Sequence, residues 1–191
     1  IALKETALAV YKEMDDVVGW LLDEVLDEDD VLLIVSDHGF DSFRRQVNLN
    51  NWLAREGFLK VRTTDRYGIP LPVRRLNRVP LDYVDWEETS AYSMAIGKIY
   101  LALSGREARG VVNPTDADSV VDSIASRLMD FVDPKTGEKV VRTVYRRDEI
   151  YAGPWVDEAP EITIDFAPGY RVSWNCTAGK INLTEGEAPD G

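Results

Sequence analysis

The stretch VLLIVSDHGF, residues 31–40, decides the predicted fold of this chain. Its first five residues, Val31–Val35, form a continuous apolar run between polar residues, which is typical of a central strand covered on both faces. The run ends abruptly at the polar segment Ser36-Asp37-His38-Gly39. We therefore expect an interior strand over Val31–Val35, with a polar loop at its carboxyl end.

The segments on either side of this stretch show helical spacing. Over residues 3–25, apolar side chains recur every three or four positions, which predicts an amphipathic helix packed across one face of the sheet. Apolar residues between 49 and 53 predict a second helix that ends at Gly57, and a short strand is expected over Phe58–Val61. A helix, a buried strand, a polar loop and another helix indicate an α/β fold.

The rest of the chain consists of a segment rich in proline and arginine, followed by a segment with strand-like and helical patterns. Residues 63–85 combine three prolines with four arginines, which predicts an irregular insertion or cap on the core. Strand-like segments then surround one helical segment at 116–131, and they lie at 91–94, 98–103, 140–145 and 162–166. We expect one domain in three parts. Residues 1–62 form the α/β core segment that carries the polar loop, residues 63–85 the insertion, and residues 86–191 the remaining α/β or α+β part.

The composition is that of an acidic globular protein. The 191 residues are 45% hydrophobic and contain 22 Lys and Arg against 34 Asp and Glu, a formal net charge of -12. This charge argues against a nucleic-acid polymer or an anionic membrane as partner, but carboxylates that recruit a metal still allow a phosphate substrate. The sequence contains neither a charged leader nor an apolar span of about 18 residues, so we expect a cytoplasmic protein without a membrane partner.

Asp37 and His38 are the candidate metal ligands. They follow the predicted strand directly, and ligand sites in α/β sheets gather at the carboxyl ends of strands. Gly39 allows the chain to turn so that both side chains point to one place. A carboxylate oxygen and an imidazole nitrogen form part of a ligand set for Zn²⁺ or Mn²⁺. The alternative is a hydrogen-bonded pair that only ties the loop.

Several motifs resemble one known family. Residues 31–40, followed by NLNNWL at 48–53, resemble the alkaline phosphatase superfamily, and more closely its type I phosphodiesterase and nucleotide pyrophosphatase branch. The segment Trp86–Val112 is similar to the W-x-x-T-x-A-Y, I-Y and G-R-E-x-x-G-x-V pattern of microbial members of that branch. The segments at 133–138, 151–154 and 159–161 continue this similarity, which therefore spans most of the chain.

The resemblance implies a fold and a metal chemistry. The fold would be part of an alkaline-phosphatase-like layered α/β structure with a mostly parallel central sheet and a small inserted or cap region. The site would hold two divalent ions, Zn²⁺ or Mn²⁺, and a Thr or Ser nucleophile would attack phosphorus. Asp37 and His38 would be two ligands of one ion. The nucleophile and the other ligands of the family pattern find no match in the sequence, so the catalytic residues are unknown.

The expected function is metal-dependent hydrolysis of phosphodiester or pyrophosphate bonds in a small-molecule phosphoester. The sequence opens at Ile1 without an initiator methionine, and we expect a C-terminal fragment that is inactive by itself. We also expect it to expose an apolar edge, and to associate with itself or with the missing upstream segment. One alternative is a phosphoglycerate-mutase-like phosphomutase or a phosphomonoesterase of the same superfamily. Another is a catalytically silent interaction domain.

Overall fold

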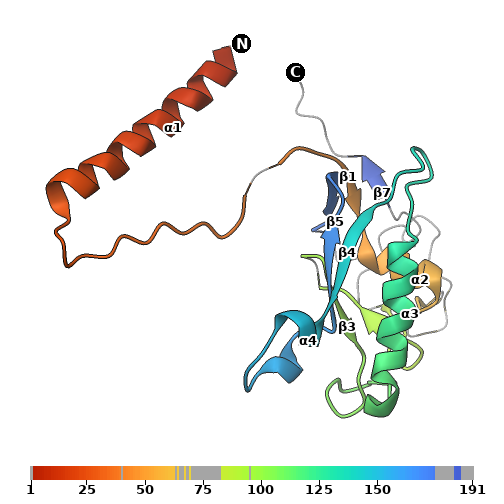
Figure 1. The fold of residues 1–191 in the computed structure, drawn as a ribbon. Coiled ribbons are helices and arrows are strands. Elements are labelled where there is room, and N and C mark those ends of the chain that lie inside the picture. The colour runs from red at the N-terminus through yellow and green to blue at the C-terminus, as the bar shows by residue number, and fades with distance from the viewer. Residues whose placement is uncertain are drawn as a thin grey trace. The chain divides into compact units, whose positions relative to one another are not determined.

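The computed structural model divides the chain into two compact units, residues 1–40 and 41–191 (Figure 1). None of its described helices combines the length and the apolar character that a membrane crossing requires. The residues that the structure describes are 2–39, 41–62, 64, 67, 69, 83–94, 96–174 and 183–185.

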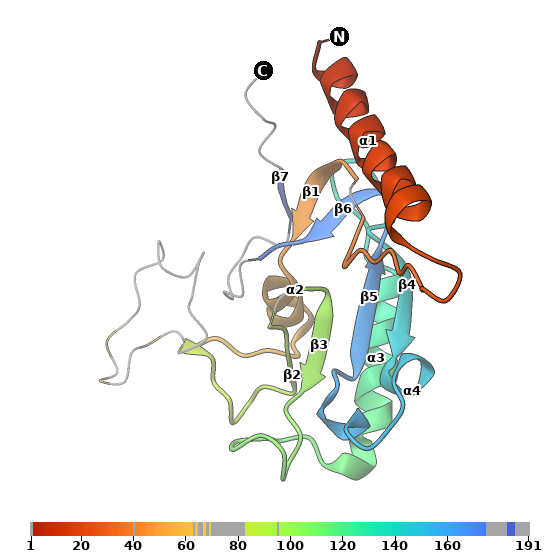
Figure 2. The same ribbon diagram turned by 90° about the vertical axis from the view of Figure 1, so that its left-hand side faces the viewer.

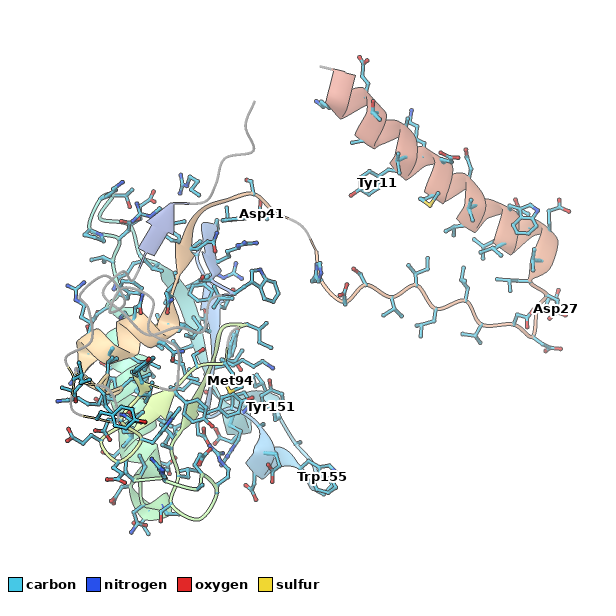
Figure 3. All side chains as sticks on the ribbon, turned by 180° about the vertical axis from the view of Figure 1, so that it is seen from behind. Tyr11, Asp27, Asp41, Met94, Tyr151 and Trp155 are labelled. Atoms are coloured by element: carbon cyan, nitrogen blue, oxygen red, sulfur yellow. The ribbon has the colours of Figure 1, made fainter. Side chains whose placement is uncertain are left out.

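The first unit begins with the predicted helix. α1 spans Ala2–Trp20 and continues as a π-helical turn over Leu21–Val25. The helix is confirmed, but its apolar side chains are about half exposed, as at Met14 with 53% and Val17 with 46%. Tyr11, at 73% exposure, projects outward from α1 (Figure 3). Within the first unit the apolar face of this helix is thus exposed, because periodicity selects an apolar face but does not supply the surface that covers it.

The segment Val31–Val35 differs most from its prediction. It is extended, but it pairs with no strand in the described part of the chain. Leu32 is 37% exposed, and the other four side chains are 74–90% exposed. An interior strand requires hydrogen-bond partners for its backbone on both sides, and strand propensity alone does not provide them. The predicted interior strand is corrected to an exposed, extended segment.

The second unit contains a three-stranded sheet. Its central strand is β1, Phe43–Val47, which pairs in parallel with β6, Gly169–Val172, and antiparallel with β7, Leu183–Glu185. The sequence analysis missed β1, because the polar residues of FRRQV interrupt its apolar pattern. The sheet joins the beginning of this unit to segments near its end.

The predicted second helix forms because both of its ends are capped. In α2, Leu49–Glu56, the side chain of Asn48 accepts a hydrogen bond from the backbone N of Asn51 at 3.2 Å. Gly57 ends the helix at φ 86°, a left-handed conformation that favours glycine. The helix buries its apolar face, which consists of Leu49, Trp52 and Leu53.

The strand expected after α2 is reduced to a single bridge between Val61 and Val84. The backbone of Phe58 bonds to a loop instead, since Ser90 N donates to Phe58 O at 2.8 Å. These irregular contacts replace the regular ladder that the prediction required. The segment predicted as an insertion, residues 63–85, lies largely outside the described residues.

A four-stranded antiparallel sheet forms the centre of the second unit (Figure 2). Each of its strands overlaps a predicted strand-like segment, with bounds that differ by at most two residues. The order across the sheet is β2 (Ala91–Tyr92), β3 (Lys98–Leu101), β5 (Ile162–Phe166) and β4 (Val141–Arg146).

The predicted helix at 116–131 is confirmed as α3, Ala117–Met129, which follows a 3-10 turn at Pro114–Asp116 and contacts β4. α3 buries one face in the core cluster that also contains residues of β3 and β5; its buried side chains are Val121, Ile124 and Leu128. A short helix, α4 (Arg147–Ile150), and a 3-10 turn at Val156–Glu158 lie between β4 and β5.

The α/β class of the prediction is confirmed. The structure combines helices with one sheet that contains a parallel pair and another that is antiparallel. Among the described strands, parallel pairing is confined to β1 and β6.

Candidate functional site

The predicted metal loop lies in the first unit, immediately after the extended segment. The Nε2 atom of His38 is 3.5 Å from Oδ2 of Asp37, and the side chains are 62% and 88% exposed. The hydroxyl of Ser36 donates to the carbonyl oxygen of His38 at 2.6 Å, which constrains the turn between the two residues. The structure thus brings both predicted ligands to one place, in an open loop.

The hydrogen bonds of His38 determine which ring nitrogen carries the proton. Nδ1 lies 3.0 Å from the carbonyl oxygen of Gly39, and a carbonyl can only accept, so Nδ1 is the donor. Nε2 then carries a lone pair unless the ring is protonated, and it is the nitrogen nearest Asp37. Ligating histidines commonly donate their second N–H to a carbonyl in this way, because the bond orients the ring.

Asp37 and His38 fit a divalent cation as two of its ligands. Two ligands of one tetrahedral Zn²⁺, each about 2.0–2.1 Å from the ion, lie roughly 3.3 Å apart. The observed 3.5 Å between oxygen and nitrogen agrees with this spacing. Within the part of the chain that the structure describes, however, no three His, Cys, Asp or Glu side chains are arranged so that they could hold a metal ion.

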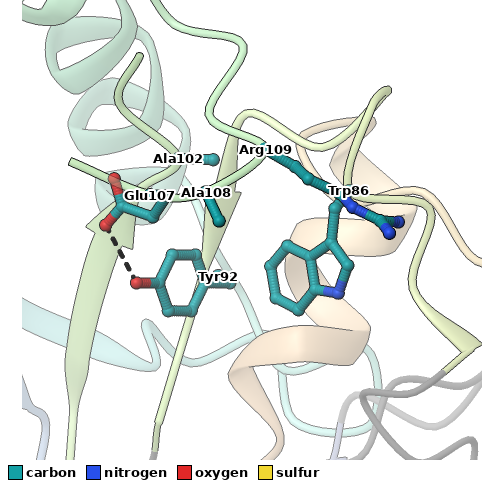
Figure 4. A pocket seen from close by; sticks show the side chains of 6 residues that line it. All are labelled: Trp86, Tyr92, Ala102, Glu107, Ala108 and Arg109. Carbon is teal, nitrogen blue, oxygen red and sulfur yellow. Dashed lines mark hydrogen bonds between the residues drawn. The ribbon is translucent and has the colours of Figure 1, made fainter. Parts of the chain in front are cut away.

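The motif stretch Trp86–Val112 builds a loop around the carboxylate of Glu107. Its Oε1 atom accepts from the hydroxyl of Tyr92 at 3.1 Å (Figure 4). The same atom accepts from Nε of Arg106 at 2.8 Å, and Oε2 accepts from the backbone N of Leu103 at 2.8 Å. Burial raises the pKa of Tyr92 to about 12, and the neighbouring charge of Glu107 adds to the increase. Glu107 is thus fully engaged in holding the loop.

Glu161 extends this ion-pair network to the strand β5. It is buried, and its Oε1 atom accepts from Nη1 of Arg106 at 2.6 Å and from Nη1 of Arg147 at 3.1 Å. Its Oε2 atom accepts from the backbone N of Leu101 at 2.8 Å. Burial acts to lower the pKa of Arg106, but the hydrogen bonds and charge of Glu161 outweigh it and raise that pKa above its ordinary value.

Gly110, the second glycine of the G-R-E-x-x-G motif, lies where the structure has no room for a side chain. A Cβ atom at this position would lie 1.9 Å from the carbonyl oxygen of Leu103. The loop therefore closes on itself only where residue 110 has no side chain. The same contact allows Leu103 and Val112 to form a bridge.

The Asp133–Glu138 motif has an equally structural role. Asp133 is fully buried, and its Oδ2 atom lies 3.1 Å from the hydroxyl of Tyr170 and 3.3 Å from Nε of Arg45. Its Oδ1 atom accepts from the backbone N of Lys135 at 2.9 Å, which closes the turn. The turn is therefore held against β1 and β6 of the small sheet.

Sequence reasoning assigned no role to Glu107, Asp133 or Glu161. The sequence does place these carboxylates beside apolar segments. A carboxylate in such a position stays buried only when a cation or several hydrogen-bond donors pair with it, so a structural role could have been suspected. Some of their partners lie far away along the chain, as Arg45 does from Asp133 and Leu101 from Glu161, so local patterns could not identify them.

The comparisons with known proteins agree with the motifs. A family model described as type I phosphodiesterase/nucleotide pyrophosphatase matches residues 4–182. The searches of curated proteins and of solved structures found no match. Because the family match covers most of the sequence, the chain belongs to the type I phosphodiesterase/nucleotide pyrophosphatase family, and its function is of that hydrolytic type.

Proposed function

We propose that this chain is part of a divalent-metal-dependent hydrolase that cleaves phosphodiester or pyrophosphate bonds in a small-molecule phosphoester. Asp37 and His38 would hold one ion, either Zn²⁺ or Mn²⁺. The observation that carries this proposal is the 3.5 Å spacing between the two side chains, with Nδ1 of His38 engaged on a backbone carbonyl. Bound metal ions supply Lewis acidity toward the phosphoryl oxygens.

The role of the two residues in this chemistry is to hold and orient the ion. The carboxylate of Asp37 provides negative charge, and the bond from Nδ1 of His38 to Gly39 orients the ring with Nε2 toward Asp37. The open loop leaves space around both groups for a phosphoester and for further ligands.

We further propose that the nucleophile and the remaining ligands come from a segment outside these 191 residues. The sequence has a single histidine, and its apolar segment Val31–Val35 is exposed beside the ligand loop. An exposed apolar strand-like segment next to a half-complete ligand set supports a missing neighbour that covers the first and completes the second.

The first test replaces the ligands in the full-length protein. Asp37→Asn and His38→Ala should each weaken metal binding by roughly tenfold or more and abolish most turnover of bis-p-nitrophenyl phosphate. Asp41→Asn is the matched control, because Asp41 is a carboxylate four positions after Asp37 that, among the described residues, accepts a hydrogen bond only from Ser42 N. Wild-type metal content and rate in both ligand variants would refute the metal role.

The second test uses the 191-residue chain alone. It should show no turnover with Zn²⁺ or Mn²⁺, and calorimetry should show weak metal binding, because two protein ligands leave the ion mostly hydrated. Turnover that follows protein concentration and disappears in Asp37→Asn would show that the active site is complete within this chain.

A further inference from the structure

A cavity of about 340 Å³ opens beside β2 and the loop that follows β3. This volume lies at the lower end of the range for small-molecule sites. The cavity belongs to the second unit and contains neither of the predicted metal ligands. Its described lining consists of Trp86, Tyr92, Ala102, Glu107, Ala108 and Arg109 (Figure 4).

Two aromatic rings form one side of the cavity and are held in place. Tyr92 and Trp86 meet edge to face, with 5.4 Å between ring centroids and 88° between planes. Tyr92 also stacks on Tyr100 at 5.7 Å and 19°, and its hydroxyl donates to Glu107. These contacts restrict rotation of the Tyr92 ring, so its surface is available without a large ordering cost.

The opposite side of the cavity is small and apolar. Ala102 and Ala108 contribute only methyl groups, and Figure 4 shows Ala108 next to the Tyr92 ring. Longer side chains at these two positions would occupy the volume that is open. The space is therefore a consequence of two alanines that face aromatic rings.

The charge of the cavity differs from that of the whole chain. The carboxylate of Glu107 is neutralised by Arg106, whose Nε lies 2.8 Å from it. Arg109 is exposed, and no described residue pairs with its guanidinium. In a chain of net charge -12, the described lining of this cavity thus has one uncompensated positive charge.

We propose that this cavity binds a small planar aromatic anion. The flat ring of the ligand would contact Trp86, and its carboxylate or phosphate would pair with the guanidinium of Arg109. Aromatic side chains favour offset or edge-on contact with other rings, and guanidinium groups form paired hydrogen bonds with both kinds of anion. The ring contact and the ion pair together select for ligands that carry both features.

The test uses 2-naphthoate as probe and the 191-residue chain in a buffer with EDTA. We expect binding by calorimetry with a dissociation constant on the order of 1 mM or lower, given the small number of ligand atoms. 2-Naphthol lacks the charge and cyclohexanecarboxylate lacks the flat ring, so each should bind roughly tenfold more weakly. 1-Naphthyl phosphate, in which phosphate replaces carboxylate, should bind in the same range and shows which anion is preferred.

Three variants locate the binding site. Arg109→Gln should weaken 2-naphthoate binding roughly tenfold. Ala108→Leu fills the space, and because Ala108 is exposed the change leaves the core intact; binding should be lost. Arg142→Gln is the control, since Arg142 is an exposed arginine paired with Asp165 on the far edge of the sheet from β2, and it should bind like the wild type.

Absence of binding at 10 mM probe, equal binding of 2-naphthol, or unchanged binding in Arg109→Gln or Ala108→Leu would each overturn the proposal. The measurements exclude divalent metal, so their outcome is independent of whether Asp37 and His38 hold an ion.

Discussion

At the scale of single residues, Glu161 has the largest predicted effect on stability. Its carboxylate is 5% exposed and pairs with two arginines, so Glu161→Gln leaves both cations with less compensation. We expect the free energy of unfolding to fall by about 2–4 kcal/mol, measured by chemical denaturation. Glu88→Gln is the control, because the exposed Lys60–Glu88 pair at 3.6 Å should contribute less than about 1 kcal/mol. Equal effects of the two changes would contradict the role of Glu161.

Tyr92 predicts a pH dependence of stability. Its pKa is raised by burial from 10.0 to about 12 in the folded chain, so the unfolded chain loses this proton first as the pH rises. The contribution of Tyr92 to stability is therefore fully present below about pH 10 and is lost as the pH rises toward about 12. Denaturation midpoints measured from pH 9 to 11.5 should decline less steeply in Tyr92→Phe than in the wild type.

Tyr151 provides a control of opposite sign. The hydrogen bond from Lys98, at 2.9 Å, lowers the pKa of Tyr151, so the folded chain releases this proton before the unfolded chain does. Tyr151→Phe should therefore steepen the alkaline decline of the denaturation midpoint. A decline that flattens equally in both variants would refute the assignment to Tyr92.

At the scale of elements, α2 is stabilised by its own ends. Asn48 caps the first turn through its side chain and is 7% exposed. Asn48→Ala should lower the free energy of unfolding by about 1 kcal/mol, because it removes an acceptor for an N–H at the helix start. Asn113→Ala, at the exposed cap of the 3-10 turn, should have a smaller effect in the same denaturation experiment. A larger loss at Asn113 would contradict this account of α2.

At the scale of the whole molecule, the two units should respond differently to proteases. Val31–Val35 is exposed, apolar and unpaired with any described strand, so thermolysin should cut there first. The second unit, residues 41–191, should then persist as a fragment in mass spectrometry. β5 serves as an internal control, because it also offers apolar residues to the protease but its Ile162 is fully buried. Cleavage in β5 at the same rate would contradict the division into units.

The amino-acid sequence by itself determined the features that depend on neighbouring residues. α2 and α3 follow from apolar spacing and end signals such as Gly57, because helical hydrogen bonds form within the segment. Asp37 and His38 are consecutive in the sequence, so both could be predicted as ligands of one metal ion without the structure. The family was also recognisable from its motifs, and the match over residues 4–182 confirms it.

Only the tertiary structure decided which distant groups meet. Val31–Val35 has the composition of a buried strand but is exposed, since a strand obtains its hydrogen bonds from other segments and composition does not name them. Arg106 and Glu161 pair across 55 positions, which local spacing could not reveal. The cavity between Trp86 and Ala108 likewise depends on how β2 meets the loop after β3. Local sequence patterns thus predict which secondary structure a segment can form, whereas the packing of the whole chain determines which other segments it contacts.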